Sequence, residues 1–382
     1  MENAVLIAST RYGLEAVVKK ELIRLGFNKL KVSDGKLEIE AAIEDIPRLN
    51  LWLRCADRIF LKQGEFMAVT FDELFEQTKA IPWERIIIPD GKFVVKGSSV
   101  KSELKSVKSC QSLIKKAIVD RLREQYCVES LHETGPMFSI HFTILKNCVT
   151  LGIDTSGTGL HKRGYRQAAG EAPLKETLAA GLVALSDWQH KHNEKMLIDP
   201  LCGSGTILIE AALQARNVAP GLRRSFAAED WPLINSCLWQ TTRQEAVDLI
   251  NHEPDLQIYG YDIDKNQIAI GIENATLAGV ENDIVFQHKE IHNLWIDRQF
   301  GTVITNPPYG IRMAELQEVN SIYRTINKMF KKKWGWSLFI LTADKMFPNY
   351  FKRSKPDRVR KLYNGNIKVN YYQYLATRKP SS

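Results

Sequence analysis

The sequence has 382 residues, of which 44% are hydrophobic and 25% are charged. This composition is ordinary for a globular chain with two or three domains and excludes a low-complexity or repetitive protein. The 52 Lys and Arg residues exceed the 44 Asp and Glu residues, so the net charge is +8. A polyanionic partner such as nucleic acid is compatible with this excess, but the excess alone does not establish one.

Two negative signals narrow the class of protein further. None of the six cysteines forms a C-x-x-C pair and no paired histidines follow at zinc spacing, so we expect reduced thiols and no metal site. No apolar run approaches membrane-spanning length, and the Met-Glu-Asn-Ala start lacks the pattern of a signal peptide. We therefore expect a cytoplasmic protein with no membrane contact.

The first 56 residues predict a small α+β module. Residues 5–8 are apolar like a strand, and residues 13–25 place their apolar side chains on one helical face. Gly26 follows as the expected C-terminal cap of that helix. Residues 36–40 then alternate between polar and apolar like a half-buried strand, and a second helical stretch follows.

Residues 57–158 predict a second α+β unit. Residues 93–97 have the pattern of a strand, and residues 106–123 that of a long helix. Two alternating runs, 138–145 and 148–153, are separated by Lys-Asn and predict a β-hairpin.

Six lysines interleaved with serines lie between residues 96 and 116 of this unit: Lys96, Lys101, Lys105, Lys108, Lys115 and Lys116. Lysine side chains and serine hydroxyls both contact phosphate in nucleic-acid complexes. The pattern favours RNA contact, although a merely solvated charged face remains an alternative.

Residues 159–382 alternate strand, turn and helix, which predicts a parallel sheet covered by helices. The strongest local feature is a strand at 196–198, then Asp199, a turn containing Gly203 and Gly205, and a helix to residue 215. Glycines let a ligand approach the backbone, and a helix N-terminus offers free N–H donors. The lysine of a phosphate-binding loop and the full dinucleotide fingerprint are absent from this turn. The acidic residue at the strand end suits a cationic or amine-bearing ligand.

The next two strands supply further acidic candidates. Asp262 ends the strand at 256–264, where a carboxylate can accept hydrogen bonds from both hydroxyls of a ribose. A plain helix cap is the alternative for Asp262, but Asp264 fits that role better. Glu290 follows the strand at 284–288 as a candidate adenine contact, although a surface glutamate would look the same.

A fourth strand ends in Asn306-Pro307-Pro308-Tyr309. Two consecutive prolines impose a rigid, extended turn. The Asn306 side-chain oxygen and the Pro307 carbonyl can each accept a hydrogen from an amino group, while Tyr309 can stack on a base. This arrangement would hold an aromatic amine with its lone pair aimed at an electrophile, which is catalysis by positioning. A rigid loop with an incidental aromatic residue is the alternative.

Asp-Pro-Leu-Cys-Gly-Ser-Gly-Thr at 199–206 and Asn-Pro-Pro-Tyr at 306–309 resemble the motifs of class I amino-methyltransferases. With the flanking segments 160–166 and 172–180, the chain is similar to the THUMP-domain RNA guanine-N2-methyltransferases that act on bacterial large-subunit ribosomal RNA. The turn at 362–366 matches that family's terminal hairpin. The likeness covers nearly the whole chain. It implies a ferredoxin-like module (1–56), a THUMP RNA-binding domain (57–158) and a Rossmann-like class I methyltransferase domain (159–382).

The resemblance implies S-adenosylmethionine as the cofactor and RNA, specifically 23S ribosomal RNA, as the partner. Cofactor-binding residues would be Asp199, Gly203, Gly205, Asp262 and Glu290, and base-positioning residues would be Asn306, Pro307 and Tyr309. The expected product is N2-methylguanosine. An N6-adenine methyltransferase on DNA or RNA and a tRNA guanine-N2-methyltransferase remain alternatives, and a non-catalytic ribosome-assembly factor is a more remote one.

Overall fold

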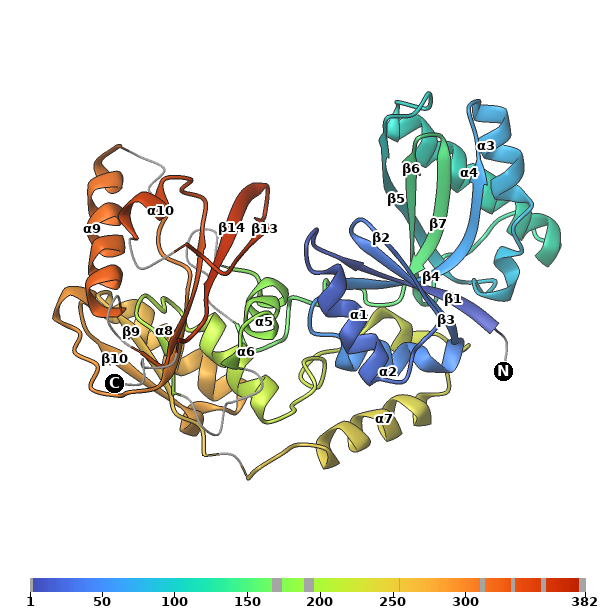
Figure 1. Cartoon of the computed structure of the whole chain (residues 1–382). Coiled ribbons are helices and arrows are strands. Elements are labelled where there is room, and N and C mark those ends of the chain that lie inside the picture. The colour runs from blue at the N-terminus through green and yellow to red at the C-terminus, as the bar shows by residue number, and fades with distance from the viewer. Residues whose placement is uncertain are drawn as a thin grey trace.

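The structure, a computed structural model, describes residues 3–166, 174–188, 196–253, 255–309, 313–330, 334–351 and 355–377. Its described residues form two halves that lie side by side, each built on a seven-stranded sheet (Figure 1). Within these residues no helix combines the length and apolar character needed to cross a membrane. The predicted α/β fold class, with α+β modules before a Rossmann-like domain, is confirmed.

The N-terminal half has the strand order β2-β3-β1-β4-β7-β6-β5. The long strand β4 (Ala56–Met67) pairs with β1 (Asn3–Thr10) on one side and with β7 (Cys148–Asp154) on the other. The ferredoxin-like and THUMP modules therefore share one continuous sheet. The remaining strands are β2 (Leu30–Ser33), β3 (Lys36–Ala42), β5 (Lys92–Val100) and β6 (Met137–Leu145).

The helices of this half are α1 (Glu15–Arg24), α2 (Ile46–Trp52), α3 (Phe71–Lys79) and α4 (Val107–Tyr126). The helix predicted at 13–25 ends as expected, because Gly26 takes a left-handed conformation (φ +95°). The predicted hairpin is β6–β7, and its two-residue turn is Lys146-Asn147. The sequence patterns did not predict β2, the full length of β4 or α3.

The C-terminal half has the strand order β10-β9-β8-β11-β12-β14-β13. The first five of these are parallel, and β14 runs antiparallel to both of its neighbours. The order reverses between β8 and β11, and parallel sheets of this kind bind ligands at the carboxyl ends of the strands beside such a reversal. The strands are β8 (Met196–Asp199), β9 (Ile258–Asp262), β10 (Ile284–His288), β11 (Gly301–Thr305), β12 (Trp336–Thr342), β13 (Arg358–Asn364) and β14 (Ile367–Tyr374).

Alternating residues of these strands fill two cores, as successive side chains on a strand point to opposite faces. Leu197, Ile304 and Phe339 belong to a core that also contains residues of the N-terminal half. Ile198 and Val303 belong to a second core on the other face. The helices are α5 (Glu176–Ala184), α6 (Thr206–Ala215), α8 (Lys265–Ala278), α9 (Met313–Phe330) and α10 (Phe347–Tyr350).

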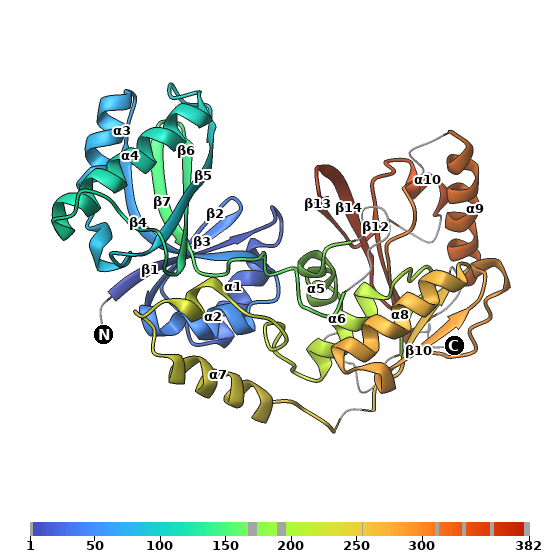
Figure 2. The ribbon, with the colours of Figure 1, turned by 180° about the vertical axis from the view of Figure 1, so that it is seen from behind.

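The segment between α6 and β9 joins the two halves. It contains α7 (Ser236–Asp248), which packs against α2 of the N-terminal half (Figures 1 and 2). The N–H of Gly221 donates to the carbonyl of Leu51 at 3.0 Å. Trp231 stacks on Phe138, with ring centroids 5.0 Å apart. Sequence patterns predicted the alternation of strand and helix in this segment, but they did not predict its contacts with the N-terminal half.

Candidate active site

The carboxyl ends of four neighbouring parallel strands bring the predicted site residues to one edge of the sheet. Asp199 ends β8, Asp262 ends β9, and Asn306 directly follows β11. Glu290 follows β10, which pairs in register with β9. Because β8 lies between β9 and β11, Asp199, Asp262 and Asn306 stand at the carboxyl ends of three adjacent strands, where strand order reverses.

Asp199 is the most buried of these residues, with only 2% of its surface exposed. Its Oδ1 accepts a hydrogen bond from the N–H of Leu201 at 3.1 Å. Burial raises the pKa of its carboxyl to about 7, and the negative charge of Asp262 adds to this increase. A positively charged ligand bound beside Asp199 would favour the ionised form of its carboxyl.

The glycine turn has the geometry that glycine permits. Gly203 and Gly205 both have positive φ, at +50° and +77°. Among the described residues other than its chain neighbours, a Cβ built on Gly203 would meet one atom within 4 Å, Oε1 of Gln267 at 3.8 Å, so these residues leave the space beside this backbone open. A Cβ on Gly205 would lie 2.7 Å from the ring of Phe286 and would clash. Gly203 thus leaves room for a ligand, while Gly205 is required for packing.

Asp262 braces this turn. Its Oδ2 accepts the N–H of Gly203 at 2.8 Å, and its Oδ1 accepts the N–H of Asp264 at 2.9 Å. Asp264 caps α8 through the N–H of Asn266 at 2.8 Å. The helix-capping alternative for Asp262 is therefore wrong. The contact with Gly203 was not predicted, because the two residues are far apart in sequence.

Glu290 lies on the same sheet edge as Asp262, because β10 is the neighbour of β9. The preceding residue, Lys289, donates its N–H to the carbonyl of Asp262 at 2.9 Å. The Glu290 side chain is half-buried and its Oε2 accepts from the amide of Asn293 at 3.3 Å. Its placement is compatible with the predicted adenine contact, which stays a prediction.

Asn306 and Tyr309 contact each other. The Tyr309 hydroxyl donates to Oδ1 of Asn306 at 2.7 Å, and the amide of Asn364 donates to that hydroxyl at 3.3 Å. The Tyr309 ring is half-buried against the larger core. Pro307 is buried, so the turn is held firmly against the sheet. Base stacking by Tyr309 and amine binding by the Pro307 carbonyl stay predictions.

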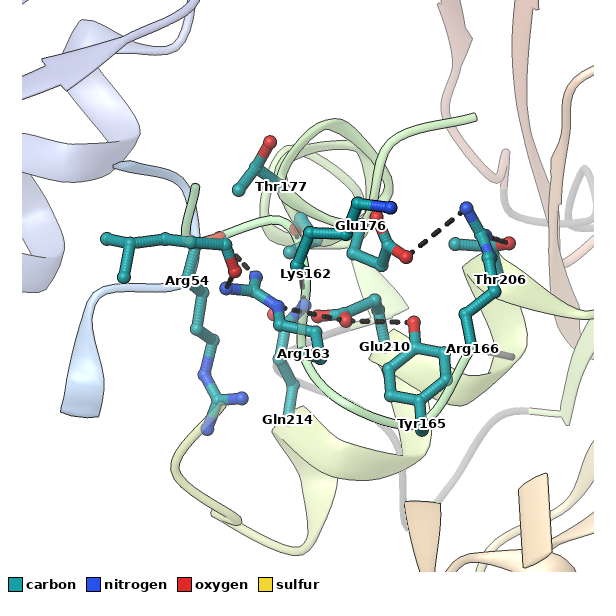
Figure 3. A network of polar contacts seen from close by, with 12 residues as sticks. Arg54, Lys162, Arg163, Tyr165, Arg166, Glu176, Thr177, Thr206, Glu210 and Gln214 are labelled. Carbon is teal, nitrogen blue, oxygen red and sulfur yellow. Dashed lines mark hydrogen bonds and ion pairs between the residues drawn. The ribbon is translucent and has the colours of Figure 1, made fainter. Parts of the chain in front are cut away.

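A buried polar network contacts α6, the helix that follows the glycine turn (Figure 3). Glu210 of α6 accepts from Arg163 at 3.3 Å and from the Tyr165 hydroxyl at 3.1 Å. Arg166 forms an ion pair with Glu176 at 3.2 Å and also contacts Thr206, the first residue of α6. The segment 160–166 is therefore structural here. One clue in the sequence was Glu210, which interrupts the apolar run at 207–213 of α6. Ala172 and Pro173 lie outside the described residues.

Comparisons with known proteins identify the class. Residues 163–373 match the family described as RMKL-like, methyltransferase domain. Residues 5–60 match the RlmL ferredoxin-like domain, and residues 68–154 match the THUMP domain. The chain belongs to this family of methyltransferases.

Particular relatives agree with this assignment. The chain is 44% identical to the putative RNA methyltransferase YpsC of Bacillus subtilis, over 100% of this chain and 98% of that protein. It is 34% identical to the ribosomal RNA large subunit methyltransferase K/L of Psychromonas ingrahamii, over 88% of this chain but 45% of that protein. The chain thus spans about half the length of such K/L proteins. The crystal structure of SMU.472, a putative methyltransferase complexed with SAH, is 40% identical with a TM-score of 0.93, covering 99% and 100% of the two chains.

The predicted class, a methyltransferase, is confirmed at the level of the family. The predicted cofactor, S-adenosylmethionine, agrees with the SAH bound in the SMU.472 structure. The residues at the sheet edge fit this cofactor. Asp199 and Asp262 would supply negative charge, Asp262 would accept hydrogen bonds from the ribose, and the space beside Gly203 would admit a ligand to the backbone. These roles stay predictions. Among the described residues no cluster of three or more His, Cys, Asp or Glu side chains could hold a metal ion.

Proposed function

We propose that this protein methylates the exocyclic N2 of a guanosine in 23S ribosomal RNA, in the cytoplasm. The observation that supports this most directly is the position of Asn306, which directly follows β11, the strand beside β8 with its terminal Asp199. An amide acceptor at this place can bind an amine hydrogen next to the methyl donor. The K/L relatives are named for large-subunit ribosomal RNA, which favours that substrate over tRNA.

The chain's own residues would act by positioning. Bound S-adenosylmethionine supplies an electrophilic methyl group on a sulfonium. Asn306 accepts a hydrogen from the guanine amine and so orients the nitrogen lone pair. As the nitrogen forms its new bond its hydrogens become more acidic, and the hydrogen bond to Asn306 strengthens in the transition state. The buried carboxylate of Asp199 favours a positively charged ligand beside it.

The N-terminal half offers the surface for RNA. Lys96, Lys101, Lys105, Lys108 and Lys116 are exposed on β5, α4 and the loop between them. Lys115 is half-buried, pairs with Glu133 at 3.6 Å and lies over the ring of Phe93. Five of the six lysines are thus exposed, and one of these five, Lys116, also lies over the ring of Phe75. Because a base inside a duplex cannot reach Asn306, the target guanosine has to be unpaired or flipped out.

Nucleoside mass spectrometry tests this function. The 23S rRNA of a strain lacking the gene should lose an N2-methylguanosine, and the intact gene should restore it while a gene encoding Asn306→Ala should not. Purified protein should then methylate the undermethylated RNA. Loss of N6-methyladenosine instead, or of N2-methylguanosine from tRNA alone, would overturn the guanine or the ribosomal assignment. Unchanged nucleosides in every RNA class would favour the non-catalytic assembly factor.

A further inference from the structure

The acceptor that the proposed chemistry needs is already in use. The Tyr309 hydroxyl donates to Oδ1 of Asn306 at 2.7 Å. Burial raises the pKa of Tyr309 to about 12, so the hydroxyl keeps its proton at neutral pH and remains a donor. The amide oxygen has two lone pairs, and an amine that takes the one now occupied displaces that hydroxyl. A half-buried hydroxyl left without a partner is unfavourable, so its release requires another acceptor.

Asn364 is placed to be that acceptor. It ends β13, and its Nδ2 now donates to the Tyr309 hydroxyl oxygen at 3.3 Å. An asparagine amide carries both a donor and an acceptor, and half a turn about its last torsion exchanges them. Asn364 can therefore donate to the hydroxyl while Tyr309 is bound to Asn306. After the turn it can accept the hydroxyl hydrogen when the base takes Asn306.

We propose that Asn364 is a positioning residue that acts through Tyr309. It holds the hydroxyl in both states and so lets Asn306 exchange its tyrosine partner for the target amine. This inference rests on the proposed function, because it concerns how the same pocket admits an amine. It adds the terminal hairpin β13–β14 to the elements that form the pocket.

The position of Asn364 is set in part by the N-terminal half. The hairpin turns at Gly365 (φ +60°), whose carbonyl accepts from the guanidinium of Arg11 at 3.4 Å. The rings of Tyr12 and Tyr363 meet edge to face, with centroids 6.0 Å apart. The loop that follows β1 therefore contacts the hairpin that holds Tyr309. The half of the chain that we expect to capture RNA borders the base pocket directly.

A double-mutant cycle separates this role from a merely structural one. Asn364→Ala should slow single-turnover methyl transfer by about tenfold, the scale of a hydrogen bond withheld from a half-buried hydroxyl, with cofactor affinity unchanged. Tyr309→Phe removes the hydroxyl and should retain most of the rate. In that background Asn364→Ala should change the rate by less than about twofold. Asn366→Ala is the matched control, because Asn366 is exposed in the same turn.

Equal losses from Asn364→Ala in the two backgrounds would overturn the proposal, as would no loss in the otherwise intact protein. A second measurement does not depend on RNA. In the full-length protein with tyrosines labelled at ¹³Cζ, the Tyr309 resonance is the one that disappears in Tyr309→Phe. It should shift in Asn364→Ala and stay in place in Asn366→Ala. An unshifted resonance would refute the contact itself, whereas a methylated adenine product would refute only the guanine assignment.

Discussion

Asp199→Asn tests most directly how the charge of Asp199 affects cofactor binding at the candidate site. The Asp199 carboxyl is 2% exposed, and burial raises its pKa to about 7, with a further contribution from the charge of Asp262. At pH 7 the Asp199 carboxyl therefore carries a proton in about half of the protein molecules. A cationic cofactor stabilises the ionised form, so we expect binding to expel that proton.

The expected pH dependence follows from this pKa. The proton release that accompanies binding should be largest at pH 6 and should fall as pH rises through about 7. The affinity should rise by up to about tenfold per pH unit below pH 7 and level off above pH 8. The same group affects stability with the opposite sign. Because its folded-state pKa lies above its unfolded value, its contribution to the free energy of unfolding is lost as pH rises toward 7.

Calorimetry in two buffers with different ionisation enthalpies measures the released protons directly. Asp199→Asn should abolish the release and flatten the pH dependence of affinity, because the amide does not titrate. Asp264→Asn is a suitable control, since Asp264 is an exposed acid that caps α8 on the same sheet edge. A wild-type affinity that is constant from pH 6 to 8, or an undiminished release in Asp199→Asn, would refute the argument.

Three further outcomes are expected. Asp262→Ala should weaken cofactor binding by about 1–3 kcal/mol in calorimetry, because it removes a charge-assisted acceptor and the brace on the Gly203 N–H; unchanged affinity would remove Asp262 from the pocket. Asn306→Ala should slow single-turnover methyl transfer on the order of 10²-fold with little change in cofactor affinity, and a full rate would contradict the positioning mechanism. Lys105→Glu combined with Lys108→Glu should weaken RNA binding and lower its salt slope by about 2, measured by titration at several salt concentrations. An unaltered slope would mean that these lysines are only solvated.

Local patterns in the sequence predicted the elements that depend on near neighbours. One contiguous segment contains the strand that ends at Asp199, the glycine turn and the helix that follows. Local sequence patterns therefore predicted these three elements in order. The end of α1 at Gly26 and the two-residue turn of β6–β7 are likewise short-range. Assigning Asp199, Asp262 and Asn306 to one edge needed only the rule that parallel strands end together.

Contacts between distant residues were not predictable in the same way. Asp262 reaches the N–H of Gly203 only because β8 and β9 are neighbours, and no local pattern encodes that pairing. Asn364 reaches Tyr309 from the far end of the chain, since β14 and β13 extend the sheet beyond β12. The turn at 362–366 was noted only as a likeness to the family's hairpin.

The joint between the halves bears on how RNA capture can be tested and on what RNA can bind. The Arg54 guanidinium donates to the carbonyl of Val218 at 2.7 Å, and a Cβ on Gly221 would lie 2.7 Å from Cα of Leu51. Cutting the chain before residue 160 would expose this shared core, so charge reversal at the lysines separates RNA capture from folding more cleanly. A packed joint also fixes the distance between those lysines and Asn306. The substrate therefore has to present its phosphates and its target base at a set spacing, which folded RNA provides and a flexible single strand does not.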